Sequence, residues 1–390
     1  MLDFTFYNPV TIYFGKDSLN KLKGAVPANA RILITYGGGS AIRSGLMEKV
    51  KGILNESGHQ IIEFGGIEPN PKYETLMKAA EVVRKEKIDF ILAVGGGSVI
   101  DGTKFICLAA YHPSDPSVML KAGFRKIKAE ETGKIIPFGS ILTLPATGSE
   151  MNSGGVISIG DGKFSVKSDH TFPVFSILDP TVTYTLPKKQ IANGIIDAFV
   201  HTTEQYLTYP VNARIQDRFA EGILQTLIEI GRPAIEETDS YEVRANLMWA
   251  ATMALNGLIG AGVPQDWATH MIGHELTARY GIDHAQTLAI ILPSLLNVRR
   301  GQKKAKLLQY AERIWNIKEG NEDERIDEAI EATRNFFESL GVRTRISDYG
   351  IDESAIAIIH KQLIDHGMTA LSETRDITPE VSKSILEQAF

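Results

Sequence analysis

Two segments in the first hundred residues have the same order of features, a short β-branched and apolar run that ends directly in three glycines and a serine. Arg31–Tyr36 is followed by Gly37–Ser40, and Ile88–Val94 is followed by Gly95–Ser98. A helical period follows each turn, and further strand-like runs lie at Gln60–Phe64, Ile141–Leu144 and Val174–Leu178. Strands that alternate with helices at this spacing predict a parallel sheet with helices on both faces.

After Pro187 the pattern becomes helical. Few strand signals remain, and helical periodicity covers the segments 188–208, 212–231, 241–260, 265–280, 302–315, 323–339, 352–366 and 378–389. The chain has 390 residues, more than the ~250–300 at which a single hydrophobic core stops growing. We therefore expect two domains, a Rossmann-like α/β domain over residues 1–187 and a helical domain over residues 188–390.

Composition excludes several classes of protein. A net charge of −6, with no basic cluster beyond an ordinary solvated helix face, argues against nucleic-acid binding. The single cysteine, Cys107, forbids an internal disulfide and any zinc site built on several cysteines. No apolar run approaches ~20 residues and the N-terminus lacks the features of a signal peptide, so we expect a soluble cytoplasmic protein without a membrane partner.

The turn at Gly95–Ser98 lies between an apolar strand and a helix. Glycines there permit positive φ and remove side chains that would block a phosphate, while the helix N-terminus favours an anion. The alternative is a plain strand-to-helix turn, because Ile42 and Ile100 occupy positions where the G-x-G-x-x-G fingerprint needs glycine. Asp101 would repel a phosphate, so any contact it makes should be with a cofactor hydroxyl or the nicotinamide side.

The turn at Gly37–Ser40 bears on the choice of dinucleotide. An acid that would bind the ribose 2′-hydroxyl of NAD is missing, since none occurs between Arg31 and Met47. The turn's N–H groups and the Ser40 hydroxyl, with Arg43 nearby, would bind a 2′-phosphate by donating hydrogen bonds to its oxygens. This pattern favours NADP(H) over NAD(H), and the alternative is a flexible turn without a ligand.

A second hydroxyl-rich segment reads Thr147-Gly148-Ser149-Glu150. Thr-x-x-Glu is also the pattern of a helix capping box, which is the structural alternative. The functional interpretation places the hydroxyls of Thr147 and Ser149 near the nicotinamide half of the cofactor.

A carboxylate and four histidines form a candidate metal site in the helical half. Asp197 and His201 are spaced i, i+4, which puts them on one helix face, and His270 and His274 repeat that spacing. His284 follows a helix end marked by Gly281. Such ligands suit Fe²⁺, Zn²⁺ or another divalent metal. A simple helical ion pair is the alternative, and spacing alone does not decide between His270 and His274.

Taken together, these motifs resemble the iron-containing (group III) alcohol dehydrogenase family. The resemblance rests on GGGSVID at 95–101, TLPATGSE at 143–150, Asp179-Pro180, Asp197-x₃-His201 and His270-x₁₃-His284. The stretch 262–276 and His284-Ala285-Gln286 resemble the butanol dehydrogenase and NADPH-dependent aldehyde reductase branch.

The resemblance implies a dehydroquinate synthase-like fold and roles for individual residues. It makes Asp197, His201, His270 and His284 the ligands of one divalent metal, with Fe²⁺ expected and Zn²⁺ as the second choice. His274 then lies beside that metal and is a candidate for the proton route. It also implies a set of cofactor contacts: Gly37, Gly38, Gly39, Ser40, Gly95, Gly96, Gly97, Ser98, Asp101, Thr143, Thr147, Ser149 and Lys167. The first domain would bind the dinucleotide and the second the metal and substrate.

The expected function is hydride transfer between NAD(P)(H) and a small-molecule primary alcohol or aldehyde such as butanol or butanal. Homodimers are common in the family. One rival is another enzyme on the same fold, a polyol dehydrogenase of the glycerol dehydrogenase type or a lyase like dehydroquinate synthase. A second rival is a nucleotide-binding protein without catalysis, in which the histidines are structural.

Overall fold

The computed structural model describes residues 1–122 and 125–390, and these form two compact units. An α/β unit comprises residues 7–186 with 238–252, and a helical unit comprises residues 1–6, 187–237 and 253–390. None of the helices described is both long enough and apolar enough to span a membrane.

The α/β unit contains a six-stranded sheet in the order β1-β8-β5-β4-β2-β3, and every neighbouring pair is parallel. Its strands are β1 (Thr11–Phe14), β2 (Arg31–Tyr36), β3 (Gln60–Phe64), β4 (Phe90–Gly95), β5 (Phe138–Leu142) and β8 (Phe175–Leu178). The parallel, Rossmann-like sheet expected from the sequence is thereby confirmed. The edge strand β1 was not predicted, because its four residues give too short a pattern.

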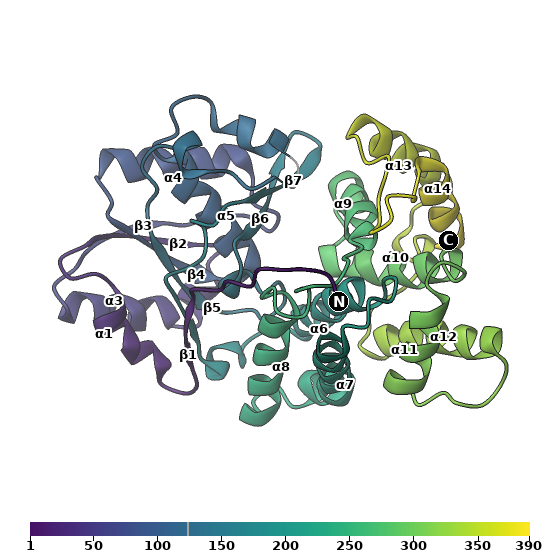
Figure 1. The fold of residues 1–390 in the computed structure, drawn as a ribbon. Helices are drawn as coiled ribbons and strands as arrows, with labels where there is room; N and C mark the ends of the chain where they lie inside the picture. The colour runs from purple at the N-terminus through teal and green to yellow at the C-terminus, as the bar shows by residue number, and fades with distance from the viewer. Residues whose placement is uncertain (123–124) are drawn as a thin grey trace. The chain divides into compact units, whose positions relative to one another are not determined.

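Helices cover both faces of this sheet (Figure 1). Side chains alternate along β2, so Ile32 and Ile34 enter one apolar cluster and Leu33 the other. The Ile32 cluster includes α1 (Leu22–Ala25) and α3 (Leu46–Glu56), and the Leu33 cluster includes α4 (Tyr73–Lys85) and α5 (Gly97–Ala109). The glycine turns of the sequence therefore lie where β2 and β4 end.

Three parts of the α/β unit depart from the sequence pattern. The helical period predicted over 42–56 is split into α2 (Ser40–Arg43) and α3, because Gly45 takes φ 75° between them. A two-stranded antiparallel hairpin, β6 (Gly154–Ile159) and β7 (Gly162–Lys167), was not predicted and packs on α5. Helix α8 (Tyr241–Ala254) clusters with this unit rather than with the helical half.

The short 3₁₀ helices of the α/β unit are η1 (Ser18–Lys21), η2 (Pro116–Ala122), η3 (Ala129–Glu131), η4 (Ser149–Met151) and η5 (Pro180–Thr183).

The helical unit is built from helices joined by loops of varied length (Figure 1). They are α6 (Lys188–Tyr206), α7 (Arg214–Glu236), α9 (Ala268–Tyr280), α10 (His284–Val298), α11 (Lys304–Ile314), α12 (Glu322–Ser339), α13 (Ser354–Asp365) and α14 (Pro379–Gln388), with a 3₁₀ turn η6 (Ser347–Tyr349). Helix α7 runs past the predicted segment 212–231 and continues one turn beyond Pro233, where the Glu237 N–H donates to the Pro233 carbonyl at 2.7 Å. Helix α10 was missed because it is buried nearly all round and shows no amphipathic period.

Candidate functional site

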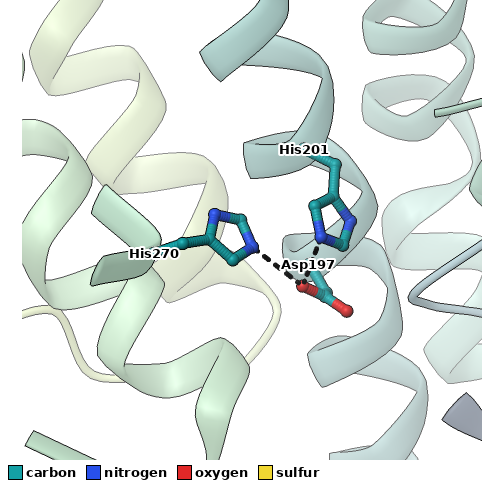
Figure 2. A group of neighbouring side chains, drawn as sticks. All are labelled: Asp197, His201 and His270. Carbon is teal, nitrogen blue, oxygen red and sulfur yellow. Dashed lines mark ion pairs between the residues drawn. The ribbon is translucent and has the colours of Figure 1, made fainter. Parts of the chain in front are cut away.

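Helix α6 delivers two of the candidate ligands. All of its residues from Ile191 to Tyr206 are buried, because apolar side chains surround the helix on every face. Helices α7 and α10 pack against it. The i, i+4 spacing places Asp197 and His201 on the same face, with His201 Nε2 3.6 Å from Asp197 Oδ1 (Figure 2). The predicted pair is therefore present in a buried environment.

The other candidates come from the neighbouring helices α9 and α10. His270 lies in the first turn of α9, and His284 is the first residue of α10. The two helices approach closely because position 273 is glycine, where a Cβ would lie 2.8 Å from Thr287 Oγ1. Asp283, just before α10, accepts a hydrogen bond from Asn193 Nδ2 of α6 at 3.0 Å, which fixes the start of α10 against the first ligand helix.

Three imidazoles converge on one carboxylate oxygen. The Nε2 atoms of His201, His270 and His284 lie 3.6, 3.7 and 3.7 Å from Asp197 Oδ1. Four ligands at ~2.1 Å from a tetrahedral metal would be about 3.4 Å apart, so these separations match the edges of a metal-binding tetrahedron better than hydrogen bonds. Asp197, His201 and His270 have ligand atoms within 4.8 Å of one another (Figure 2).

Two buried atoms at this point have no conventional partner. Asp197 Oδ1 and His270 Nε2 accept or donate no hydrogen bond within the described parts of the chain. Buried polar atoms without partners are rare in native proteins and call for an explanation such as an ion. A hard carboxylate with neutral imidazoles is a donor set suited to Fe²⁺ or Zn²⁺, so the residues present fit a divalent metal.

His274, which the sequence could not separate from His270, occupies a different place. It lies one turn further along α9, and its ring centroid is 5.0 Å from that of His284 and 6.2 Å from that of His270. The three residues whose ligand atoms all lie within 4.8 Å of one another include His270 and not His274, and His284 joins them through its 3.7 Å separation from Asp197 Oδ1. The geometry thus separates the two α9 histidines, with His270 inside the ligand cluster and His274 beside it.

Glu204 is a functional residue that the sequence reasoning missed. Its Oε2 pairs with His270 Nδ1, and its Oε1 accepts the Thr269 N–H at 2.7 Å. A carboxylate on the far nitrogen of a metal-binding histidine fixes the imidazole tautomer and orientation. The signal was present, because Asp197, His201 and Glu204 are spaced i, i+4, i+7 and therefore share one helix face.

Proton affinities in the cluster reflect its two carboxylates. Burial alone raises the pKa of Asp197, but the charges of His201, His270 and His284 lower it, and the net shift is downward. Burial lowers the pKa of His270, whereas Glu204 and Asp197 raise it, and the result is about 9. A metal that binds here near neutral pH therefore has to displace a proton from His270.

The two glycine turns use their glycines differently from what the sequence suggested. Within the two turns, Gly37–Ser40 and Gly95–Ser98, Gly39 alone takes a left-handed φ, 91°, and it is the N-cap of α2. The expectation of positive φ at Gly95–Gly97 is wrong. Gly97 is required by packing instead, since a Cβ there would lie 2.5 Å from Thr147 Oγ1. The second turn therefore lies directly against the hydroxyl-rich segment.

A buried network joins α5 to the hydroxyl-rich segment. Ser149 Oγ donates to Asp101 Oδ1 at 2.5 Å, and the Val156 N–H donates to Asp101 Oδ2 at 2.9 Å. Lys104 is fully buried and its Nζ donates to Ser149 Oγ at 2.8 Å. Burial lowers the pKa of Lys104 to about 8, against the charges of Asp101 and Glu150. Asp101 and Ser149 were both predicted cofactor contacts, and they hold each other in place.

The remaining predicted contacts are spread along the same unit. Thr143 follows β5, and its N–H donates to the Gly95 carbonyl at 3.0 Å, so the two strand ends lie together. Lys167 ends β7 and is exposed. The capping box is not formed, because Glu150 Oε1 accepts from Thr252 Oγ1 at 2.5 Å and Gly148 is the N-cap of η4.

Comparison with known proteins connects both units to one family. Residues 9–180 match the model of the iron-containing alcohol dehydrogenases, and residues 191–390 match the C-terminal model of the same family. Over the full length of both chains, the protein is 60% identical to the NADPH-dependent aldehyde reductase YqhD of Escherichia coli and 37% identical to the NADH-dependent butanol dehydrogenase A of Clostridium acetobutylicum.

Solved structures give the same result. A crystal structure of YqhD from E. coli K-12 superposes with a TM-score of 0.97 at 59% identity, covering 100% of this chain and 99% of that chain. The NADH-dependent butanol dehydrogenase A of Thermotoga maritima superposes with a TM-score of 0.93 at 34% identity, again covering 100% and 99% of the two chains. Because family models match both units and the full-length identity reaches 60%, the chain belongs to the iron-containing alcohol dehydrogenase family and is an NAD(P)-dependent oxidoreductase of alcohols and aldehydes.

Proposed function

We propose that this chain is a metal-dependent NADPH aldehyde reductase, which also oxidises primary alcohols, and that Asp197, His201, His270 and His284 hold its metal. The observation that carries the proposal is the convergence of three imidazole Nε2 atoms at 3.6–3.7 Å from a single buried carboxylate oxygen. Residues 1–187 would bind the dinucleotide, and residues 188–390 would hold the metal and substrate.

The chain's own residues would prepare the reaction in three ways. A divalent metal, with Fe²⁺ proposed first and Zn²⁺ second, would act as a Lewis acid on the substrate oxygen. Glu204 keeps the Nδ1 proton on His270 and so aims the Nε2 lone pair of that ring at the ligand cluster. The residues of α6 around Asp197 are buried, which keeps water away from that carboxylate. The nicotinamide carries the hydride, and the protein's part is alignment.

His274 is the proposed proton route. Its ring is 5.0 Å from that of the proposed ligand His284, and it lies outside the ligand cluster. An imidazole that binds no metal titrates near neutral pH and is suited to passing a proton between the substrate oxygen and solvent. In reduction, His274 would supply the proton that the new hydroxyl group takes up.

The α/β unit would hold the dinucleotide at its two glycine turns. The proposed contacts are Gly37, Gly38, Gly39, Ser40, Gly95, Gly96, Gly97, Ser98, Asp101, Thr143, Thr147, Ser149 and Lys167. Preference for NADP(H) over NAD(H) is supported by the missing acid between Arg31 and Met47 and by Arg43, whose guanidinium already donates to the Gly38 carbonyl at 3.3 Å. The name of the E. coli relative, an NADPH-dependent enzyme, is consistent with this choice.

Turnover on a small panel of substrates tests the proposal. The protein is purified anaerobically, reconstituted with Fe²⁺ or Zn²⁺, and assayed with NADPH and NADH on butanal, butanol, glycerol and dihydroxyacetone. We expect the highest kcat/KM with NADPH and butanal and little turnover of the polyols. A metal content below ~0.2 per chain with no turnover on any substrate would overturn the proposal and favour a non-catalytic nucleotide-binding protein.

We further propose a cytoplasmic homodimer. Support for the dimer comes from the first strand, β1, which is at the sheet edge and carries Phe14 at 42% exposure, and from exposed apolar residues just before it: Met1, Leu2, Phe4, Phe6 and Tyr7. Support for a reducing compartment comes from Cys107, which is buried and unpaired. Light scattering should give twice the chain mass, and cell fractionation should place the protein with the cytosol.

A further inference from the structure

A buried cluster of charges lies in the helical unit outside the ligand set. Lys303, at the start of α11, is 3% exposed, and its Nζ is 2.8 Å from Asp266 Oδ2 and 2.9 Å from Glu373 Oε1. Burial lowers the pKa of Lys303, but the two carboxylates outweigh it and the net shift is upward, so the residue stays charged. Burying three charged groups is costly unless each is paired, and here each is.

Lys303 also contacts the end of the first ligand helix. Its third donor goes to the carbonyl oxygen of Leu207, the C-cap of α6, at 2.7 Å. A lysine ammonium near a helix C-terminus satisfies an orphan carbonyl and favours the negative end of the helix dipole. Helix α6 carries Asp197 and His201, so Lys303 is bonded directly to the element that presents them.

Asp266 extends the same cluster to the second ligand helix. Its Oδ1 accepts the N–H of Ala268, the first residue of α9, at 3.1 Å. Its own N–H donates to the Glu204 carbonyl of α6 at 2.9 Å. The backbone of Asp266 therefore holds the segment that leads into His270 to α6, while its side chain caps the start of α9.

The residue between Asp266 and α9 is held in an unfavourable conformation. Trp267 takes φ 65°, a left-handed backbone that a bulky side chain rarely adopts. Its indole lies edge-on to the His270 ring at 5.5 Å and to the His201 ring at 6.1 Å between centroids. Such a conformation persists only where the surroundings fix it, and the bonds of Asp266 are immediately adjacent.

We propose that Lys303 is a positioning residue of the metal centre. Through Leu207 it fixes the end of α6, and through Asp266 it fixes the entry to α9, so it sets the separation of the two helices that carry Asp197, His201 and His270. Glu373 completes the ammonium's bonding. The inference rests on the proposed ligand set, because it concerns how those ligands are held.

Metal affinity and coordination geometry test this role independently of turnover. Lys303→Met and wild type are titrated with Co²⁺ against a competing chelator, and the visible absorption of bound Co²⁺ is recorded. We expect the variant to bind Co²⁺ about tenfold more weakly, the scale seen for groups that support metal ligands, with an altered spectrum. Circular dichroism melts ensure that every titration is run on folded protein.

The matched control is Lys306→Met, on the same helix. Lys306 is also buried at 6% exposure and pairs with Asp217, but it has no bond to Leu207 or Asp266. It should lose a comparable amount of thermal stability while keeping the wild-type Kd and spectrum. If Lys303→Met does not fold, Asp266→Asn takes its place, since its amide oxygen can still accept the Ala268 N–H while its NH₂ group cannot accept a hydrogen bond from the Lys303 ammonium.

The outcomes separate the two proposals. Wild type that binds no Co²⁺ contradicts the proposed ligand set itself. The positioning role alone is overturned if wild type binds Co²⁺ and Lys303→Met, or Asp266→Asn in its place, shows a Kd within about twofold of wild type and the same spectrum. Equal weakening in the Lys306→Met control would also overturn it, because a general loss of stability would then explain the change.

Discussion

Removing the charge of Glu204 should weaken metal binding by changing which nitrogen of His270 carries a proton. Glu204 is acceptor-only when ionised, so His270 Nδ1 donates to it and Nε2 faces the ligand cluster with a lone pair. In Glu204→Gln the Thr269 N–H still needs an acceptor, which leaves the amide NH₂ towards Nδ1. A neutral His270 would then hold its proton on Nε2, where the metal has to bind.

The size of the effect follows from the bond that must be given up. Restoring the productive tautomer leaves either the Thr269 N–H or the His270 Nδ1–H buried without an acceptor, at a cost of about 1–3 kcal/mol. Because ~1.4 kcal/mol is tenfold in an equilibrium constant, we expect Kd to rise between about fivefold and 150-fold. A rise of 10–100-fold is typical for lost partners of metal-binding histidines.

The pH of the measurement decides whether this loss is visible. Against the effect of burial, the charges of Glu204 and Asp197 raise the pKa of wild-type His270 to about 9. At pH 7 the metal therefore displaces a proton at a cost of about 3 kcal/mol, and the uncharged variant lowers this cost. The two effects oppose each other at pH 7. A chelator-buffered Zn²⁺ titration at about pH 9.5 removes the proton term and isolates the tautomer term.

Glu275→Gln is the matched control for this experiment. Glu275 is equally buried and binds the Nδ1 of a histidine, His366, at 3.0 Å, yet neither residue belongs to the ligand cluster. Its Kd should stay within about twofold of wild type. A Glu204→Gln variant that is folded and binds Zn²⁺ as tightly as wild type at pH 9.5 would refute the reasoning.

Three further predictions concern the same chain. His284→Ala should abolish turnover and weaken metal retention, whereas His274→Ala should lower kcat and keep the metal; equal metal loss in both, measured by elemental analysis, would contradict the ligand assignment. Metal Kd should fall about tenfold per pH unit from pH 7 to the His270 pKa near 9 and then level off, since one proton is displaced; a flat profile would remove that linkage. Gly38→Asp should lower kcat/KM for NADPH at least about tenfold, roughly 1.4 kcal/mol, and spare NADH, without loss of thermal stability because a Cβ at Gly38 meets nothing within 4 Å; equal loss with both cofactors would show that this turn does not read the 2′ position.

The sequence predicted the α/β unit well because its strands are buried between two helical layers. Strand β4 is buried at every position, and a continuous apolar run between glycine turns is the pattern that such a strand leaves. The hairpin β6/β7 was missed because its burial is mixed, although Gly160-Asp161 between the two runs is a typical two-residue turn signal. Helix α10 was missed for the opposite reason, since it has too few polar positions to show a period.

Only part of the candidate site was visible in spacing. Asp197 and His201 follow from i, i+4 on one helix, but the place of His284 depends on α10, which lies against both α6 and α9. The choice of His270 over His274 needed the rotation of α9, which residue spacing does not contain. Lys303, Asp266 and Glu373 are far apart in sequence, so no local pattern could have joined them.

The charges of the metal centre explain why its proton affinities are so unusual. Asp197 and Glu204 bring two negative charges into a site where both are 3% exposed or less. A divalent cation with neutral imidazoles would balance them, so the loaded centre would carry no net charge. Without a cation, two buried carboxylates remain, and a proton taken up by His270 offsets one of them, which is why its pKa rises to about 9. The proton and the metal are therefore alternative counter-charges for the same pair of carboxylates, and Glu204→Gln, which removes the charge of one of them, should change the affinity for both.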